Sequence, residues 1–569
     1  MSQDLQAGPV TLLQLFKGER EYRSPLFQRR YVWGGTEIEK LYNDVDEILE
    51  VEGSTRFLGA LVLEVAAAGM AFQPDSSWIV DGQQRLTTLY MALLHIAQYA
   101  ESAGEKDLAN SLFTQYLFNQ DGEYRNKPKV TPTFLDNQQF NDLFSNFRSV
   151  AANLPKPFGE KRGQLQKASG LIQRRIRERC FNGRNFNAEK ATTLIKALLE
   201  KLKFVQIVLG DNQDPHQVFD SLNALGVRLE NKDLIRNIVF QRLSESPTDA
   251  ESLYNRRWIP FEQELGDDLE SYFFPFTLIH RPTVTKSSLL TNLRDRWRDW
   301  NPDQIVDDLR VYVPAFNALS KDDRNARDSL SESQVVNDLM WRFHRMKAPT
   351  TLYPYILKLV TEFRSGAIAE DWAVRNLKQI ESFVVRRSLA GFEPSGLHAI
   401  FKDLWHKTKG DPMIMVKEID ASPTIRFPED DEFSHDIKER PLYGRRMAGY
   451  ILAEYERGLI GGDPMPEVDI TIDHVMPREL TEVWKEVISE DDHKALKDTW
   501  ANLVPLSGPA NAEKGRKPWS EIRPFFMTET IFKTTKRLAQ TNEDWNAPKI
   551  RTRGEQLAIW AVSRWPKRA

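Results

Sequence analysis

The chain has 569 residues, of which 41% are hydrophobic and 28% are charged, and its formal net charge is −4. This composition is typical of a folded protein with several domains and excludes a long disordered chain. The slight negative charge excludes an overall basic field as the means of binding nucleic acid. Residues 511–569 differ, because they hold 13 Lys or Arg against 6 Asp or Glu. This basic segment could meet phosphates, or it could simply be a solvated helix face.

The single cysteine, Cys180, excludes a disulfide within the chain and a zinc site built from several cysteines. A chain with a single cysteine is typical of proteins in the reducing cytoplasm. Cys180 follows several arginines on a polar helix, so we interpret it as a packing residue rather than a nucleophile. The N-terminus lacks a basic and apolar signal region, and no apolar stretch approaches the roughly 18 residues of a membrane helix. We therefore expect a cytoplasmic protein without a membrane partner.

The N-terminal region shows a strand, a turn and a helix in sequence. Residues 57–65 and 78–80 are short apolar runs typical of buried strands. Asp81 and Gly82 then predict a turn, and leucines recur at helical spacing after Gln83, so a helix is predicted to begin there.

A second part of this region has a similar pattern. Residues 204–209 predict another strand, and residues 214–237 predict two helices joined by a turn at Gly226. Together these elements predict an α/β domain over residues 1–245.

The rest of the chain is predicted to be mostly helical. From about residue 250 to 408 the apolar residues recur at intervals of three and four. Boundaries in polar or proline-containing segments divide the chain into domains over 1–245, 246–430 and 431–569. The predicted fold class is therefore α+β and predominantly helical, with a helical middle domain between two domains that contain strands.

The most informative residues lie in the C-terminal region, in the order Asp473, His474, Asn502, Asn511 and Lys514. A neutral histidine can act as a general base near pH 7, and a carboxylate with other oxygen ligands can hold a hard divalent cation. Neighbouring residues of a strand point to opposite faces. One side chain could therefore bind a metal ion while the next faces the attacking water.

The spacing of these residues predicts a β-hairpin followed by a helix, the plan of a ββα-metal nuclease domain. The strand-like segment with His474 is followed by a helical insert and by a turn that leads into a helix near Asn511. The alternative is a hydrogen-bonded loop histidine with asparagines that merely favour turns.

A second unusual string is Asp81-Gly82-Gln83-Gln84-Arg85. Backbone amides at a helix N-terminus favour an anion, Gly82 permits close backbone approach, and Arg85 offers a forked donor for phosphate oxygens. These features suggest a nucleotide-phosphate site built without a P-loop, whose signature the sequence lacks. The alternative is a turn that caps the helix, with Arg85 in a buried ion pair.

The stretches IDHVMP and WANLVPLSGPANAEKGRKPW, with the final WNAPKIRTRGEQLAIWAVSRWP, resemble the HNH (His-Me finger) nuclease domain of GmrSD-type, modification-dependent restriction endonucleases. An HNH pattern alone has low specificity, but the flanking matches make the resemblance more specific. The resemblance implies that His474 is the general base and that Asp473 and Asn511 bind one Mg²⁺ or Mn²⁺ ion. It also implies that Asn502 orients the loop or the imidazole and that Lys514 helps to bind phosphate.

The string DGQQR, with PLFQRRYVW, FLG and VFDSLNALGVRLENKDLIRN, resembles the ParB-like N-terminal domain of the same family. This domain is associated there with nucleoside triphosphate (NTP) hydrolysis and with sensing of modified DNA. The implied nucleotide-binding residues are Asp81, Gly82, Gln83, Gln84 and Arg85. Weaker candidates for contact with nucleotide or DNA are Gln28, Arg29 and Tyr31.

These resemblances imply a single-chain, NTP-responsive, metal-dependent endonuclease that nicks or cuts double-stranded DNA, in particular modified phage DNA, in antiviral defence. A nucleotide-switched DNA-binding regulator without cleavage is the alternative from another class of protein, and a ribonuclease would use the same chemistry. A homodimer is left open.

Overall fold

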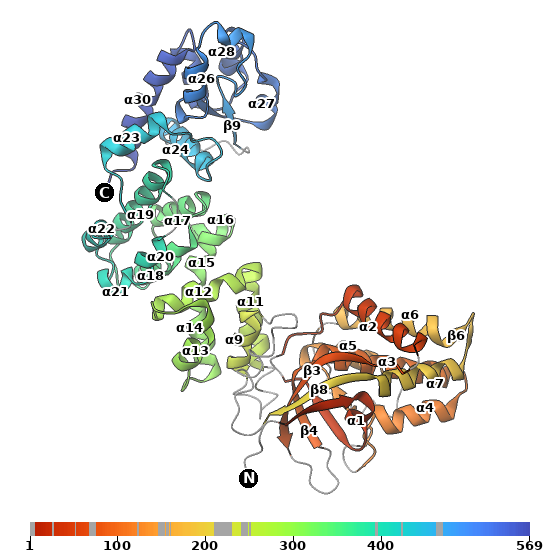
Figure 1. Ribbon diagram of the computed structural model, residues 1–569. Helices are drawn as coiled ribbons and strands as arrows, with labels where there is room; N and C mark the ends of the chain where they lie inside the picture. The colour runs from red at the N-terminus through yellow and green to blue at the C-terminus, as the bar shows by residue number, and fades with distance from the viewer. Residues whose placement is uncertain are drawn as a thin grey trace. The chain divides into compact units, whose positions relative to one another are not determined.

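The computed structural model describes residues 6–25, 28–51, 53–67, 75–121, 125–145, 154, 157, 159, 161–209, 230–240, 249, 252–392, 396–422, 425–461 and 470–568. The chain divides into two compact units, Met1–Arg256 and Arg257–Ala569, which Figure 1 shows in red to yellow and in green to blue. The fold is mostly helical, and a mixed sheet lies in the first unit. The predicted α+β class with predominant helix is confirmed.

The first unit is built on a six-stranded sheet in the order β1-β8-β3-β4-β2-β5. β8 pairs parallel with β3 and antiparallel with β1, while β4 pairs antiparallel with β3 and parallel with β2. The strands predicted over 57–65, 78–80 and 204–209 are confirmed as β3, β4 and β8. The strands of this unit are β1 (Gln6–Thr11), β2 (Arg20–Arg23), β3 (Arg56–Ala67), β4 (Asp75–Asp81), β5 (Val130–Thr131), β6 (Phe181–Asn182), β7 (Asn185–Phe186) and β8 (Leu202–Leu209).

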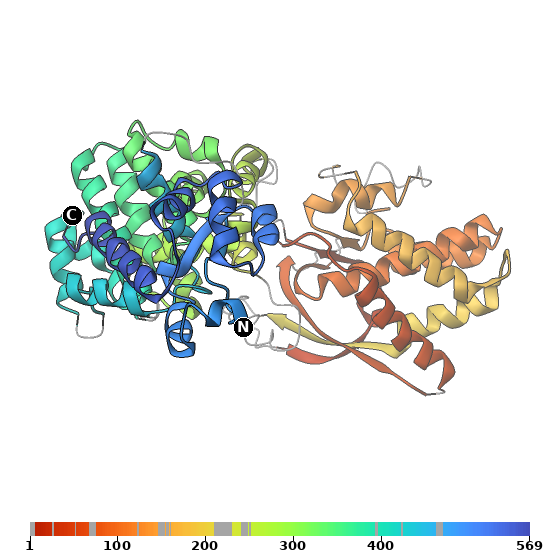
Figure 2. The ribbon, with the colours of Figure 1, turned by 90° about the horizontal axis from the view of Figure 1, so that it is seen from above.

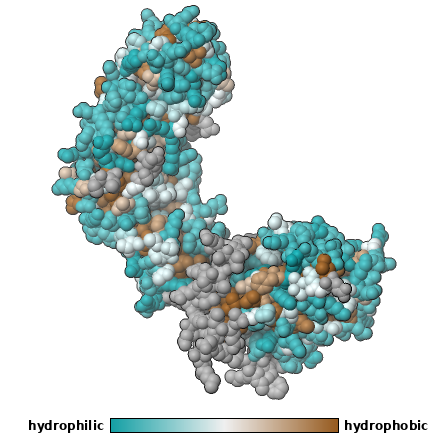
Figure 3. Space-filling view, viewed as in Figure 1, coloured by the Kyte–Doolittle hydropathy of each residue, from teal (hydrophilic) through white to brown (hydrophobic). Residues whose placement is uncertain are grey.

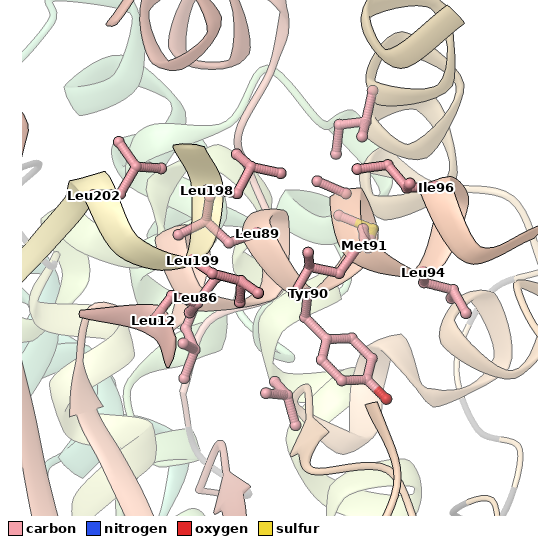
Figure 4. Close-up of a cluster of buried hydrophobic side chains, with 14 of the residues drawn as sticks. Leu12, Leu86, Leu89, Tyr90, Met91, Leu94, Ile96, Leu198, Leu199 and Leu202 are labelled. Carbon is pink, nitrogen blue, oxygen red and sulfur yellow. The ribbon is translucent and has the colours of Figure 1, made fainter. Parts of the chain in front are cut away.

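Helix α3 (Gln83–Ser102) forms the centre of the core of the first unit. The residues at helical spacing, such as Leu86 and Leu89, are buried, and so are Tyr90 and Leu94 on other faces. A helix that is hydrophobic all round needs neighbours on every side, and α3 contacts the helices α4, α6 and α7. Figure 4 shows α3 side chains among those of other elements, including Leu12, Leu198, Leu199 and Leu202.

Except for α9 (Asn231–Phe240), the other helices of the first unit pack around α3 and the sheet (Figure 2). Cys180 ends α6 and is buried, and desolvation raises the pKa of its thiol to about 12, so it is a packing residue as predicted. The helices of this unit besides α3 are α1 (Leu12–Phe16), α2 (Gly35–Glu50), α4 (Lys106–Leu112), α5 (Asn137–Asp142), α6 (Gln164–Cys180), α7 (Ala188–Lys196) and α9 (Asn231–Phe240).

Some of the predicted features fall outside the described residues. These are Leu26 and Phe27 of the PLFQRRYVW stretch, residues 210–229 with Asn223 and Gly226, and the whole polar boundary segment 244–248. The second of the two helices predicted over 214–237 is present as α9.

The turn between β4 and α3 depends on Gly82, which has φ +94°. A Cβ atom there would lie 2.9 Å from Leu61 Cδ1 and 3.2 Å from the carbonyl oxygen of Ala60. Glycine is thus required twice, for its left-handed conformation and for the close approach of β3. This explains why the chain can change from strand to helix within a single residue.

The second unit contains most of the region predicted as a helical middle domain and the whole region predicted as a nuclease domain. Its first part is helical throughout the described residues. These helices are α11 (Ile259–Leu265), α12 (Leu269–His280), α13 (Leu289–Arg296), α14 (Pro302–Arg310), α15 (Val313–Ser320), α16 (Arg324–Asp328), α17 (Gln334–Arg345), α18 (Tyr353–Arg364), α19 (Glu370–Leu389), α20 (Leu397–Phe401), α21 (Leu404–Thr408) and α22 (Pro412–Asp420).

Its second part carries a short hairpin among helices. Here β9 (Thr471–His474) pairs antiparallel with β10 (Leu503–Leu506), and a helical insert separates the two strands. The helices are α23 (Asp430–Glu439), α24 (Ala448–Ile460), α25 (Glu482–Lys485), α26 (Glu490–Leu496), α27 (Gly508–Lys514), α28 (Trp519–Thr528), α29 (Lys533–Thr541) and α30 (Ala547–Arg564).

A buried polar network joins the two parts of this unit. Glu381 of α19 is fully buried and accepts hydrogen bonds from Tyr450, Arg564 and Trp565, at 2.7, 2.7 and 3.0 Å. Buried charges need such partners. The end of the chain is therefore fixed against the helical part.

The surface of both units is mostly hydrophilic on the face shown in Figure 3, with scattered hydrophobic residues. Within the described ranges, no helix combines the length and the apolar character that crossing a membrane requires.

We expect replacement of Gly82 by alanine to destabilise α3 by about 1–3 kcal/mol, because it combines left-handed strain with a clash against β3. Gly104→Ala is the matched control: Gly104 has φ +87°, but no described heavy atom lies within 4 Å of the place that a Cβ atom would take there. Hydrogen exchange of α3 amides measures both effects. Equal losses of protection in the two variants would contradict the close-approach argument.

Candidate functional site

The hairpin of the second unit sets the direction of the candidate catalytic residues. The register pairs His474 with Leu503 and Asp473 with Val504. Because side chains alternate along a strand, Asp473 and His474 leave β9 on opposite faces. Helix α27 follows directly after β10 and brings Asn511 and Lys514 to the Asp473 face.

Lys514 links α27 to both residues of the β9 pair. Its Nζ lies 2.7 Å from Oδ2 of Asp473, and it also donates to the carbonyl oxygen of His474. All three side chains are buried. The ammonium of Lys514 and the carboxylate of Asp473 therefore form a buried ion pair.

His474 is oriented by a carboxylate from the helical insert. Its Nε2 lies 3.0 Å from Oδ1 of Asp498. A carboxylate can only accept a hydrogen bond, so the proton is assigned to Nε2 and the lone pair to Nδ1. An imidazole held in this tautomer can accept a proton at Nδ1.

The ring of Tyr443 covers the imidazole of His474. The two ring centroids are 4.3 Å apart with an interplanar angle of 60°. The backbone amides of Leu442 and Tyr443 donate to the carbonyl oxygen of Asp498, at 2.8 and 3.1 Å. The segment before α24 is therefore tied both to His474 and to its carboxylate partner.

Burial shifts the ionisation of the site towards neutral forms. Desolvation lowers the pKa of His474, partly offset by Asp498, which raises it. Desolvation also raises the pKa of Asp473 and lowers that of Lys514, while the attraction between these two opposes both shifts. Since an unperturbed histidine titrates near 6.5, His474 is neutral at pH 7.

Asn502 is fully buried and holds the loop that follows β9. Its Oδ1 accepts from the amide of Met476 at 2.8 Å and from Trp545 Nε1 at 3.2 Å. Its Nδ2 donates to the carbonyl oxygens of Met476 and Lys497, both at 2.8 Å. The side chain therefore uses its oxygen and its nitrogen to fix the backbone beside His474.

Asn511 lies within α27 and is half-buried. Its Nδ2 donates to Thr471 Oγ1 at 3.3 Å, and Thr471 is two residues before Asp473 on the same face of β9. The carboxamide oxygen of Asn511 is not used in this bond. Asp473 and Asn511 thus belong to the same side of the hairpin.

Sequence reasoning missed Asp498 and Tyr443. Asp498 is 24 positions from His474 along the chain, inside an insert whose fold no local spacing rule describes. Tyr443 lies outside the hairpin altogether. Only the packing of the insert and of the segment before α24 brings these two side chains to the imidazole.

The glutamines of the Asp81–Arg85 string contact the protein backbone. Gln83 Nε2 donates to the carbonyl oxygen of Arg29 at 3.1 Å. Gln84 accepts from the amide of Val32 at 2.8 Å and donates to the carbonyl oxygen of Arg30 at 3.3 Å. Both amides therefore hold the segment 28–33 against the start of α3.

Arg85 pairs with Asp81 one helical turn earlier, with 3.1 Å between Nη2 and Oδ2. It also donates to the carbonyl oxygen of Leu58 at 2.6 Å. Gly59 makes room for this guanidinium, because a Cβ atom there would clash with Nη1 of Arg85. The side chains of Arg85 and Asp81 remain 19% and 35% exposed, so solvent reaches this ion pair.

The three weaker candidates lie beside this string. Gln28 Nε2 donates to the carbonyl oxygen of Val80 at 2.9 Å, and the hydroxyl of Tyr31 lies 2.6 Å from Thr88 Oγ1. Both residues are buried, whereas Arg29 is half-buried. The structure brings the whole set together around the N-terminus of α3.

Comparison with known families matches most of the first unit and the C-terminal part of the second unit. The family described as GmrSD restriction endonuclease, N-terminal domain, matches residues 12–240, and the family described as GmrSD restriction endonucleases, C-terminal domain, matches residues 427–560. Together the two matches cover more than half of the chain. The chain belongs to the GmrSD restriction endonuclease family. A search of curated proteins finds no match.

Both candidate sites lie within these GmrSD domains. The Asp81–Arg85 string falls in the N-terminal match, and the hairpin with His474 falls in the C-terminal match. Residues 241–426, between the two matches, include all of the helices α11–α22.

We expect Asp498→Asn to lower the pKa of His474 further, because the charge that favours the imidazolium is removed while an oxygen acceptor remains. The acid limb of any activity that needs neutral His474 should move to lower pH. Metal-free NMR titration of labelled histidines measures the shift.

Asp492→Asn serves as the control, since Asp492 is paired with Arg551 rather than with His474. An unchanged or raised His474 pKa in Asp498→Asn would show that the carboxylate does not act on the imidazole.

Proposed function

We propose that this GmrSD protein is an NTP-responsive endonuclease that hydrolyses double-stranded DNA at an HNH-type, metal-dependent site. The observation that carries the proposal is the β9-β10-α27 arrangement. It places a neutral histidine with a carboxylate partner on one face of β9, and an acid and a carboxamide on the other. Family membership supports the endonuclease class.

The donors present fit a hard divalent cation. The carboxylate of Asp473, which is paired with the Lys514 ammonium, and the amide oxygen of Asn511 are hard oxygen donors on the same side of the hairpin. No described cluster of three His, Cys, Asp or Glu residues could hold a metal. Two protein oxygens, with water and phosphate completing the shell, suit Mg²⁺ or Mn²⁺. The ion would neutralise charge that develops on the phosphate and assist the leaving oxygen.

The other roles in catalysis and DNA binding are assigned to residues of this chain. Nδ1 of His474 accepts the proton of the attacking water, and Asp498 stabilises the imidazolium that results. Lys514 keeps Asp473 and the backbone of His474 in register, and Asn502 holds the following loop. The basic segment 511–569 supplies positive charge for the DNA backbone.

The nucleotide response is assigned to the first unit. Its support is the N-terminus of α3, where backbone amides favour an anion, and the partly exposed ion pair of Asp81 and Arg85. Gln83 and Gln84 hold the segment 28–33 there, so nucleotide contacts would come from the exposed edge of the ion pair and from Arg29. Modified phage DNA is the proposed substrate, in antiviral defence in the cytoplasm.

We expect His474→Ala to reduce nicking of supercoiled plasmid by about 10²–10⁴-fold, the usual contribution of a general base. DNA binding in a gel-shift assay should persist, because the imidazole contributes no net charge at pH 7. His435→Ala, which replaces a histidine of the same unit outside the hairpin, should cut like the parent chain.

Unchanged behaviour of His474→Ala in every assay would instead support a regulator that binds without cutting. Parallel digestion of RNA and DNA with Mg²⁺ or Mn²⁺ decides between a deoxyribonuclease and a ribonuclease.

We expect Arg85→Ala to abolish NTP turnover, measured as phosphate release, since it removes the cation at the exposed edge of the motif. Arg85→Lys keeps the charge and should retain part of the activity. Circular dichroism checks that both variants fold. Undiminished NTP turnover in a folded Arg85→Ala protein would show that the motif is not part of the nucleotide site.

A further inference from the structure

Arg478 is the first exposed residue after β9, and it lies beside the candidate general base. Its Nε is 3.7 Å from Oδ1 of Asp498, the atom that also accepts from Nε2 of His474. Its guanidinium carbon is 5.0 Å from the centroid of the Tyr443 ring, which covers the imidazole. One cationic side chain thus contacts both neighbours of His474. We refer to His474, Asp498 and Tyr443 as the His474 cluster.

The backbone that carries Arg478 is anchored in the fold. The amide of Met476 donates to Oδ1 of Asn502 at 2.8 Å. The carbonyl oxygen of Pro477 lies 2.8 Å from Nε2 of His493. All four of these residues are buried. The side chain of Arg478 therefore starts from a fixed point, so less conformational entropy is lost when it binds a ligand.

The contacts of Arg478 leave its hydrogen-bonding capacity unused. A guanidinium carries five N–H donors, and the 3.7 Å distance to Asp498 exceeds that of a hydrogen bond. Among the residues that the structure describes, none accepts a hydrogen bond from Arg478. The neighbouring carboxylate of Glu479 is paired with Arg516 instead. The side chain of Arg478 is 57% exposed, so it can bind an anion without first losing a strong partner.

The other cation beside the His474 cluster is engaged inside the fold. The side chain of Lys514 is only 2% exposed, and its ammonium pairs with Asp473 and donates to the carbonyl oxygen of His474. Withdrawing this ammonium towards a phosphate would leave the carboxylate of Asp473 buried without its partner, which is costly. Among the described residues, the exposed cation that contacts the His474 cluster is Arg478.

A phosphodiester under attack gains negative charge. Addition of hydroxide increases the charge on the phosphate oxygens as phosphorus becomes five-coordinate. Positive groups fixed where this charge develops lower the barrier. The proposed metal ion would act from the Asp473 face of β9, whereas Arg478 lies on the side of the His474 cluster. The two would therefore stabilise the charge from different sides of the hairpin.

We propose that Arg478 is a catalytic residue that donates hydrogen bonds to a phosphate of the strand being cut, at or beside the scissile bond. Its Nη1 and Nη2 form a fork that matches two oxygens of one phosphate, while Tyr443 and Asp498 orient the guanidinium. No proton moves to or from Arg478, because a guanidinium stays charged. This inference rests on the proposed nuclease function and adds a phosphate contact to it.

Nicking of supercoiled plasmid at saturating Mg²⁺ tests the catalytic contribution. We expect Arg478→Gln to lower kcat by about 10²-fold, because a fixed donor to the developing charge is lost. Arg478→Lys keeps the charge but not the fork, so it should recover part of the loss. Both variants change an exposed side chain, and circular dichroism checks that they fold. Arg298→Gln is the matched control, since this arginine has a 72% exposed side chain and an ion pair with Asp295, in the helical part of the same unit.

Binding of a labelled plasmid fragment without divalent metal tests the contact itself. Fluorescence anisotropy gives the affinity over a range of salt concentrations, and the slope of its logarithm against the logarithm of salt reports the number of phosphate contacts. We expect Arg478→Gln to reduce the magnitude of this slope by about 0.9, the value for one lost contact. Arg298→Gln should keep the slope of the parent chain.

The two measurements separate the possible failures. A fall in kcat with an unchanged salt slope would show that Arg478 acts only through Tyr443 and Asp498, and would overturn the phosphate contact. Parent-like kcat in Arg478→Gln would overturn its catalytic role. A parent chain that binds DNA without nicking it would contradict the proposed function, and the salt slopes would still decide whether Arg478 contacts phosphate. A parent chain that does not bind the fragment would overturn both.

Discussion

The candidate active site depends on one buried ammonium group. Lys514 of α27 contacts the carboxylate of Asp473 and the carbonyl oxygen of His474, so it fixes the helix against a strand whose neighbouring side chains must point to opposite faces. Desolvation makes these contacts costly to lose, because breaking them leaves a buried charge without compensation. The separation of an acid–amide face from a histidine face follows from this arrangement. In the proposed mechanism, base chemistry and metal binding would then not compete for the same side chain.

Much of the fold and part of the candidate site could be predicted from the sequence, because the signals that predict them are local. Apolar runs and the Asp81–Gly82 turn predicted β3, β4 and α3, because alternation, helical spacing and glycine conformation operate over a few residues. Alternation along β9 predicted the divergence of Asp473 and His474 in the same way. Asp498 and Tyr443 could not be predicted, since tertiary packing alone brings them to the imidazole.

The glutamines of the first unit show that residues of a proposed binding motif can also hold the fold together. Gln83 and Gln84 look from the sequence like donors and acceptors for a base, yet in the fold they hold the backbone of residues 28–33. Through Gln83, this use fixes the backbone of Arg29 at the N-terminus of α3. In the proposal, the string therefore both shapes the nucleotide-binding surface and supplies side chains to it. Close packing also requires glycine at two positions near the string, because Gly59 lies against Arg85 and Gly82 lies against Ala60 and Leu61 of β3.

The central claim is that Asp473 and Asn511 share one divalent cation on the face of β9 opposite the His474 imidazole. Anomalous diffraction from crystals of the full chain grown with Mn²⁺ tests it most directly. The account predicts a single strong peak in this unit within about 2.0–2.6 Å of the Asp473 carboxylate and the Asn511 amide oxygen, distances typical of hard cations with oxygen ligands. A peak between His474 and Asp498, or no peak at the hairpin at saturating Mn²⁺, would contradict it.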